Sequence, residues 1–179
     1  MTSTSAQPIS VQPSQSTAFL ALDFTSYIVE NYSSTPEVAA RAAHALSLAR
    51  SAGLPVFHVV PEAMRAEIHP LLIPNEDEPV LGKSTIGAFA TTDLHARLQE
   101  QGCEQIIVAG VATSGTVLST ARWAFDIGYR VIVCVDACAD PDPGAHAALV
   151  DERMFSESWL GLWRIATVLP TREIAALGM

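Results

Sequence analysis

The feature that most constrains the fold is a unit that recurs along the chain: a helical stretch, a glycine and a short apolar run. Three such helical stretches end at Gly53, Gly102 and Gly128, a few residues before the next run. Glycine adopts the left-handed conformation that ends many helices without a steric penalty. The apolar runs are rich in Val and Ile and have no polar face, as strands buried between helices do; they are residues 18–22, 55–60, 105–111, 130–135 and 165–169.

A helix between successive strands makes βαβ units, in which the strands run parallel. The sequence therefore predicts an α/β fold: a three-layer, doubly wound, largely parallel sheet with helices on both faces. One helix should begin near Pro36, a second should contain Leu94 and Leu98 behind a Thr91 or Thr92 cap, and a third should bury four positions: Val117, Ala121, Ala124 and Phe125.

The chain is long enough for one domain of ordinary size, since it has 179 residues of which 49% are hydrophobic. Residues 1–16 carry no charged side chain and no apolar run, so we expect a flexible polar leader rather than a secretory signal. Residues 17–179 are predicted to form the single domain. Residues 61–82 contain four prolines and no clear period, which predicts a long loop with one helical turn and a short strand at Val80. Long loops in compact domains are often part of a binding site.

The net charge of the chain bears on which macromolecules it can bind, and its cysteines bear on the compartment in which it works. Ten basic residues stand against nineteen acidic ones, a formal net charge of −9, and the arginines are scattered. Such a surface repels phosphate and anionic lipid, so we expect neither a nucleic-acid nor a membrane partner. The three cysteines fit no disulfide framework and no zinc site, and reduced thiols favour a cytoplasmic protein; they are Cys103, Cys134 and Cys138.

Polar residues follow several of the predicted strands at their carboxyl ends, where open α/β sheets bind ligands. Asp23 follows the first strand, and a turn of small residues at 110–115 leads into a helix. Asp136 also follows a strand, but we interpret it as a cap of the turn 138–142. Lys83, the only lysine of the chain, follows the proline-rich loop and could reach the same crevice.

Taken together, three blocks resemble one family. Asp23, the segment KSTIGAF at residues 83–89, and residues 108–140 resemble the isochorismatase-like (cysteine hydrolase) superfamily in order and spacing. The resemblance covers residues 18–169. It implies a hydrolase that acts on a small molecule and forms a homodimer or homotetramer.

The resemblance also implies roles for individual residues. Amidase members of the superfamily use an Asp, Lys and Cys triad, in which Asp23 matches the aspartate and Lys83 the lysine. The Val111–Ala112 bond matches a cis peptide that helps to form an oxyanion hole, for which the backbone amides of Ala112 and Thr116 are the candidates.

One position departs from that pattern. Thr116 stands where the nucleophilic cysteine is expected. A threonine hydroxyl loses its proton far less readily than a thiol, so the covalent thioester route is excluded at Thr116. After Asp23 the chain also has Phe24-Thr25 where many members have Met-Gln.

The histidines do not match the metal-binding nicotinamidase branch of the superfamily, which has an aspartate and paired histidines in the middle loop. His58 lies within a predicted strand, where a packed core imidazole is expected, and His69 lies in the proline-rich loop. We therefore expect no zinc or other metal and no cofactor.

Three functions remain open. The first is a cysteine-independent hydrolase of an amide C–N or vinyl-ether bond, with Asp23 as acid and base, Lys83 as charge stabiliser and Thr116 positioning water. The second is a catalytically inactive family member that serves as a small-molecule binding or assembly module. The third is an amidase that uses Thr116 or Cys138 covalently.

The substrate pocket is expected to be lined by Phe24, Tyr27, Phe89 and the loop 61–79. Core packing explains the aromatic character of Phe24 and Tyr27 equally well. Resemblance alone makes a helical segment around 146–158 a candidate oligomer contact. The three tryptophans could serve either the core or a subunit interface, and core packing is favoured; they are Trp123, Trp159 and Trp163.

Overall fold

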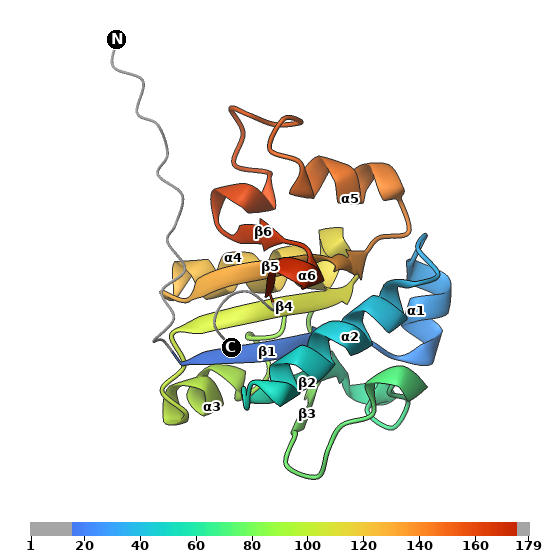
Figure 1. The fold of residues 1–179 in the computed structure, drawn as a ribbon, viewed down its shortest axis with the longest axis vertical. Helices are drawn as coiled ribbons and strands as arrows, with labels where there is room; N and C mark the ends of the chain where they lie inside the picture. The colour runs from blue at the N-terminus through green and yellow to red at the C-terminus, as the bar shows by residue number, and fades with distance from the viewer. Residues whose placement is uncertain (1–15, 175–179) are drawn as a thin grey trace.

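The computed structural model describes residues 16–174, so the predicted leader at 1–16 lies outside the described residues except for Ser16. The described chain folds around a six-stranded sheet in the order β3-β2-β1-β4-β5-β6, in which every neighbouring pair is parallel (Figure 1). The strands are β1 Thr17–Leu22, β2 Val56–Pro61, β3 Val80–Lys83, β4 Gln105–Val111, β5 Arg130–Ala139 and β6 Thr167–Leu169. The predicted α/β fold is confirmed, including the short strand at Val80.

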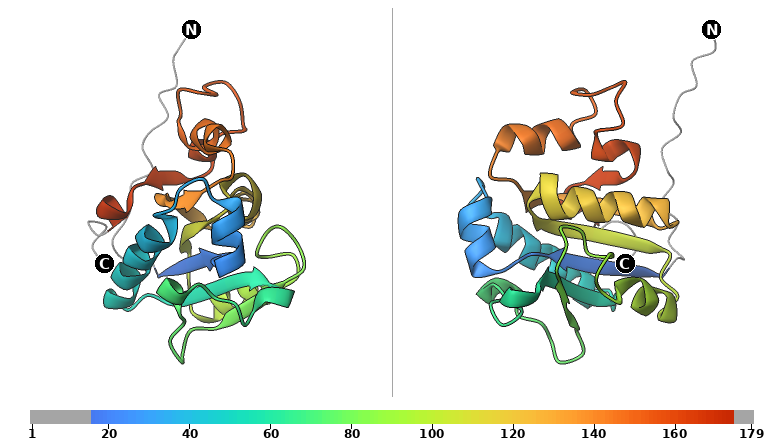
Figure 2. Two further views of the ribbon diagram at one scale, coloured as in Figure 1. Left: turned by 90° about the vertical axis from the view of Figure 1, so that its right-hand side faces the viewer. Right: turned by 180° about the vertical axis from the view of Figure 1, so that it is seen from behind.

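Helices cover both faces of the sheet. The helix α2 lies in front of the sheet in Figure 1, whereas α4 lies in front when the molecule is seen from behind (Figure 2, right). The helices are α1 Ser26–Tyr32, α2 Val38–Ser51, α3 Leu94–Glu100, α4 Leu118–Asp126, α5 Pro143–Val150 and α6 Thr171–Ile174. Alternate residues of the strands feed two separate cores, as the period of two requires. In β1, Leu20 packs on the α3 and α4 side, and Phe19 on the α2 side.

The three glycines that the sequence places at helix ends have the left-handed backbone expected of them. Gly53, Gly102 and Gly128 have φ of +68°, +65° and +99°, in the left-handed region that other residues avoid. Gly110 has a different reason to be small, because a Cβ there would lie 2.8 Å from Cβ of Leu22 on the neighbouring strand.

The strand β5 is longer than the sequence indicates. It runs to Ala139, and its register against β4 shifts between Val108 and Gly110. Asp136 therefore lies within the strand, and the prediction that it caps the turn at 138–142 is wrong. Instead, its Oδ1 accepts hydrogen bonds from the backbone N–H and the hydroxyl of Thr171, at 2.8 and 2.7 Å, and caps α6.

Several helix details differ from the expectation. The helix α2 begins at Val38, two residues after Pro36. The N-cap residue of α3 is Asp93, which makes no side-chain capping bond, so the prediction of a Thr91 or Thr92 cap is wrong; the hydroxyl of Thr92, one residue earlier, accepts the N–H of Leu94 at 3.2 Å. In and before α4 the predicted apolar positions are buried except for Phe125, which is 45% exposed. The helix α5 ends at Val150, so the predicted helical segment around 146–158 is helical only in its first part.

The proline-rich loop forms two short 3₁₀ turns, Glu62–Met64 and Pro70–Leu72. A buried ionic cluster fastens its far end to the domain. Glu78 accepts two hydrogen bonds from Arg50, both at 2.7 Å, and lies 3.1 Å from Nε2 of His58. His58 is buried as predicted, and its polar edge is satisfied by this carboxylate.

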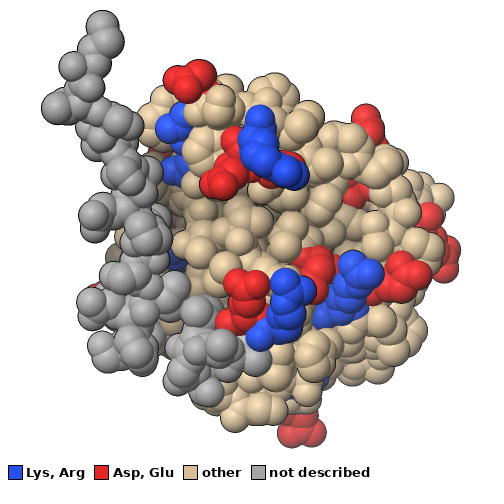
Figure 3. Space-filling model, turned by 45° about the horizontal axis from the view of Figure 1, so that its top comes forward, with Lys and Arg blue, Asp and Glu red and all other residues tan. Residues whose placement is uncertain are grey.

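Within residues 16–174 no helix is long and apolar enough to cross a membrane, and no three or more His, Cys, Asp or Glu side chains gather as metal ligands would. On the face shown in Figure 3, acidic and basic side chains lie next to one another.

Candidate active site

Three residues that are far apart in the sequence meet at the carboxyl-end edge of the sheet. Asp23 directly follows β1, Lys83 is the last residue of β3, and Thr116 lies in a π-helical turn, Thr113–Val117, that follows β4. Nζ of Lys83 lies 2.9 Å from Oδ2 of Asp23 in an ion pair whose side chains are both nearly buried. The structure thus brings together the carboxylate, the ammonium and the hydroxyl that the sequence placed in one crevice.

The ammonium of Lys83 is completely engaged by the protein. Besides Asp23, it donates to the backbone carbonyl oxygens of Thr85 at 3.1 Å and of Ile86 at 2.7 Å. A lysine ammonium has three N–H donors, and these three acceptors account for all of them. Lys83 is therefore fixed in place and has no donor left for a bound molecule.

Asp23 is the titratable group with the chemically useful shift. Burial raises the pKa of its carboxyl from 3.8 to about 6, although the charge and hydrogen bond of Lys83 and the nearby Thr116 hydroxyl lower it. Both protonation states are accessible near neutral pH, so the carboxyl can donate or accept a proton. Its backbone has φ of +58°, a conformation that Asp and Asn tolerate better than most residues.

Two oxygen atoms beside this ion pair lack partners. Among residues 16–174, Oδ1 of Asp23 and Oγ1 of Thr116 are buried and accept or donate no hydrogen bond. The Thr116 hydroxyl is close enough to lower the pKa of Asp23 without completing a hydrogen bond to it. A buried polar atom without a partner costs about 1–3 kcal/mol, so these two atoms mark a place where a ligand or water would be stabilised.

A cavity of about 320 Å³ lies beside the ion pair. Its lining is mostly apolar and is formed by Asp23, Tyr27, Ile28, Tyr32, Met64, Lys83, Ile86, Val111, Ala112, Gly115 and Thr116. The rings of Tyr27 and Tyr32 are 6.3 Å apart and tilted by 58°. Concave sites with apolar walls and a few convergent polar groups are typical of small-molecule binding.

Of the three aromatic residues predicted to line the pocket, only Tyr27 does. Phe24 is 1% exposed and packs with α2 in one core. Phe89 is buried in the other core, with its ring stacked 6.1 Å from that of Tyr129. Both cores need large apolar side chains, and the sequence does not reveal which aromatic residues meet that need. Of the loop 61–79, Met64 reaches the cavity.

Residues 17–160 match the isochorismatase domain family. The chain belongs to this family. It is 35% identical over 139 residues to the uncharacterized isochorismatase family protein YddQ of Bacillus subtilis, which covers 69% of this chain and 77% of that protein. It is 33% identical over 147 residues to streptothricin hydrolase of Streptomyces noursei, covering 75% of this chain but only 53% of that protein.

Solved structures of family proteins agree with the fold. An isochorismatase family protein from Burkholderia thailandensis superposes with a TM-score of 0.79 at 24% identity, over 93% of this chain and 96% of that one. An isochorismatase from Pseudomonas putida gives 0.76 at 26% identity, over 94% and 93% of the two chains.

In this isochorismatase-family chain, two residues that sequence reasoning missed hold the π-helical turn in place. The turn follows a cis peptide bond between Val111 and Ala112, which the resemblance predicted. Oδ2 of Asp140 accepts the backbone N–H of Ser114 at 2.7 Å, and Nδ1 of His146 lies 2.8 Å from the hydroxyl of Thr113. Burial lowers the pKa of His146, against the attraction of Asp140. Sequence reasoning missed Asp140 because it ended β5 before Asp136. The signal that could have found Asp140 is an aspartate directly after the last strand residue, Ala139.

Cys138 does not reach the cavity of this family site. It is buried in the α4-side core with its sulfur 3.9 Å from the carbonyl oxygen of Val108, and burial raises the pKa of its thiol. A covalent route through Cys138 is therefore closed.

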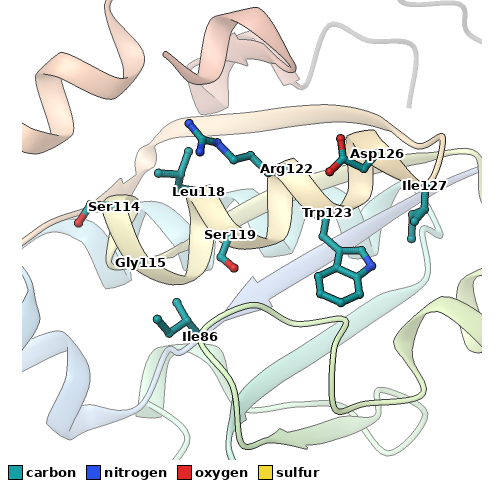
Figure 4. A pocket seen from close by; sticks show the side chains of 9 residues that line it. All are labelled: Ile86, Ser114, Gly115, Leu118, Ser119, Arg122, Trp123, Asp126 and Ile127. Carbon is teal, nitrogen blue, oxygen red and sulfur yellow. The ribbon is translucent and has the colours of Figure 1, made fainter. Parts of the chain in front are cut away.

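A larger depression of about 670 Å³ continues from the cavity along α4 and shares Ile86 and Gly115 with it. Figure 4 shows Ser119 and Trp123 on the Ile86 side of the helix, with Arg122 and Asp126 on the other side. Trp123 is 46% exposed and Trp159 is 69% exposed, so the prediction that they pack in the core is wrong.

Proposed function

We propose that this chain is a cysteine-independent hydrolase of a small molecule, in which Asp23 transfers protons and Lys83 stabilises its charged form. Thr116 takes the position of the family's nucleophilic cysteine and holds the attacking water. The observation that carries the proposal is the pair of buried, unpartnered oxygens of Asp23 and Thr116, two residues that line the cavity. Hydrolysis is also the activity in the names of two relatives, streptothricin hydrolase and maleamate amidohydrolase.

The bond that is cleaved is an amide C–N or a vinyl ether. For an amide, ionised Asp23 takes a proton from the water at Thr116, the water oxygen bonds to the carbonyl carbon, and the amides of Ala112 and Thr116 hold the oxyanion. Asp23 then returns the proton to the leaving nitrogen as the C–N bond breaks.

For a vinyl ether, protonated Asp23 gives its proton to the terminal carbon of the double bond. Water adds to the resulting oxocarbenium carbon and returns a proton to Asp23, and the hemiketal separates into a ketone and an alcohol. Both routes use a carboxyl with a pKa near 6 and need no thiol.

The test is a pH–rate profile on small amides, ureas and vinyl ethers with wild type and Asp23→Asn. General acid–base catalysis contributes about 10²–10⁴-fold, so kcat should fall by at least 100-fold in the variant. Asp136→Asn is the matched control, because that carboxylate caps α6 away from the cavity. Absence of turnover with every compound, or turnover unchanged in Asp23→Asn, would contradict the proposal.

The competing function is a non-catalytic binding module, and one observation favours it. Because the Asp23–Lys83 pair is buried, losing either member strands the other charge, so the pair can persist without catalysis. A ligand that raises Tm without being consumed would support this reading.

A further inference from the structure

We propose that the cavity takes uncharged small molecules and rejects compact anions, so that the substrate is a neutral compound with one polar group and an apolar or planar body. That the bound molecule is a substrate rests on the proposed function, whereas the selection of uncharged molecules concerns binding alone.

The first step is the charge of the lining. Of the residues that line the cavity, Asp23 and Lys83 alone carry a formal charge, and they form an ion pair with each other. A carboxylate brought into such a site loses its hydration and is stabilised only by a cation or by several donors. The remaining lining supplies no cation: its side chains are apolar except for the hydroxyls of Tyr27, Tyr32 and Thr116, and the backbone amides of Ala112 and Thr116 are the proposed donors to the reacting oxygen.

The second step is that Lys83 cannot act as the cation for a ligand. Its three donors are directed to Asp23 and to the carbonyl oxygens of Thr85 and Ile86. An anionic ligand would have to displace one of these acceptors. Displacing Asp23 leaves a buried carboxylate without its partner, and displacing a carbonyl leaves a backbone acceptor unpaired.

The guanidinium of Arg122, in the larger depression along α4, is also out of reach of a small ligand in the cavity. Arg122 lies on α4, six residues beyond Thr116, which is about 9 Å along the helix axis. It lines the depression along α4 rather than the cavity, and it donates to the carbonyl oxygen of Trp159 at 3.2 Å. A compact substrate whose polar group contacts Thr116 therefore does not place a carboxylate on Arg122.

Two polar atoms of the lining residues define the polar group that is accepted. Oδ1 of ionised Asp23 can only accept a hydrogen bond, whereas the Thr116 hydroxyl both donates and accepts. A carboxamide, urea or hydroxyl group both donates and accepts, so it can pair with these atoms directly or through the water that Thr116 holds. Tyr27, Tyr32 and Met64 then contact the rest of the molecule.

The test compares matched pairs of ligands at pH 8, where Asp23 is ionised. Benzamide is paired with 4-carboxybenzamide, and phenyl vinyl ether with 4-carboxyphenyl vinyl ether, and Kd is measured by calorimetry or ligand-observed NMR. The neutral member of each pair should bind at least tenfold more tightly. Equal or tighter binding of the carboxylate, or binding of neither member, would overturn the inference.

A rescue variant makes the comparison sharper. Met64→Arg places an unengaged guanidinium on the cavity wall and should reduce the preference for the neutral ligand at least tenfold. Ile86→Arg serves the same purpose at a 66% exposed wall position if the first variant does not fold. Leu71→Arg is the matched control, because it adds the same charge at an exposed site outside the cavity and should leave the preference unchanged. A preference that Leu71→Arg reduces as strongly would assign the selection to net charge and overturn the inference.

Binding is read without turnover in these experiments, so the two proposals fail separately. A neutral-selective cavity with no catalysis would contradict the proposed hydrolase and support the inference. Turnover of compact anions with lower KM than their neutral partners would do the reverse.

Discussion

Replacing Asp23 with Asn should change how the stability of the protein depends on pH. The folded-state pKa of Asp23 is about 6, above its ordinary value of 3.8. Between these values the folded chain keeps a proton that the unfolded chain has released, so this group stabilises the fold fully below pH 3.8 and loses that effect as pH rises through 6. At 1.36 kcal/mol for each pKa unit, the loss amounts to about 3 kcal/mol.

Asp23→Asn removes this titration while keeping the shape of the side chain. Asn also tolerates φ of +58°, so the backbone is not a separate source of destabilisation. The variant leaves Lys83 without its anion at every pH, which shifts its stability curve without supplying a carboxyl that titrates. The free energy of unfolding of wild type minus that of the variant should therefore fall by about 2 kcal/mol from pH 4 to pH 7, which is most of the full span.

Urea denaturation at half-unit pH steps, followed by tryptophan fluorescence, measures this difference. Glu78 titrates in the opposite sense, but it is present in both proteins and cancels. The ¹³C shift of the Asp23 carboxyl gives the folded-state pKa independently. Parallel stability curves over this range, or a carboxyl that titrates near 4, would show that Lys83 outweighs burial, and the reasoning would be refuted.

Three other substitutions test separate parts of the structure. Thr116→Cys should place a thiol beside Lys83, with a pKa below the usual value of about 8.5; intact mass after iodoacetamide should show one fast adduct, and none would contradict the site geometry. Glu78→Gln should destabilise by about 2 kcal/mol at pH 7. Although burial raises the pKa of Glu78, hydrogen bonds from Arg50, Asn75 and His58 lower it to about 2, so this loss should shrink as pH falls from 4.5 towards 2 in urea titrations. Gly110→Ala should cost about 1–3 kcal/mol in the same assay, because its Cβ meets β1; an unchanged midpoint would exclude that contact.

Much of the fold could be predicted because its signals are local. The glycine at each of three helix ends, and the apolar runs that follow, are readable from a few consecutive residues, and they place Asp23 and the turn before Thr116 at one edge of the sheet. Lys83 could be placed near the same crevice from the short strand predicted at Val80, but its role beside Asp23 came from the resemblance, since the strand is short and follows an aperiodic loop.

The missed features depend on three-dimensional packing. The register shift in β5 has no local signature, and the strand continues past Asp136 to Ala139, so that Asp140 follows it. Whether an aromatic residue fills a core or lines a cavity depends on what packs against it, which is why Phe24 and Trp123 were both misplaced. The pKa of Asp23 is a balance between burial and a neighbouring charge, and neither quantity is written in the sequence.

The ammonium of Lys83 is held by two backbone carbonyl oxygens, so its position does not depend on which side chains the loop carries at residues 85 and 86. Because Thr85 and Ile86 hold the ammonium through main-chain oxygens, the side chain of Ile86 is free to change without moving that ammonium. Ile86 is also a wall residue with two-thirds of its surface open to solvent. Mutational libraries at this position can therefore explore new ligand preferences while the Asp23–Lys83 ion pair stays intact.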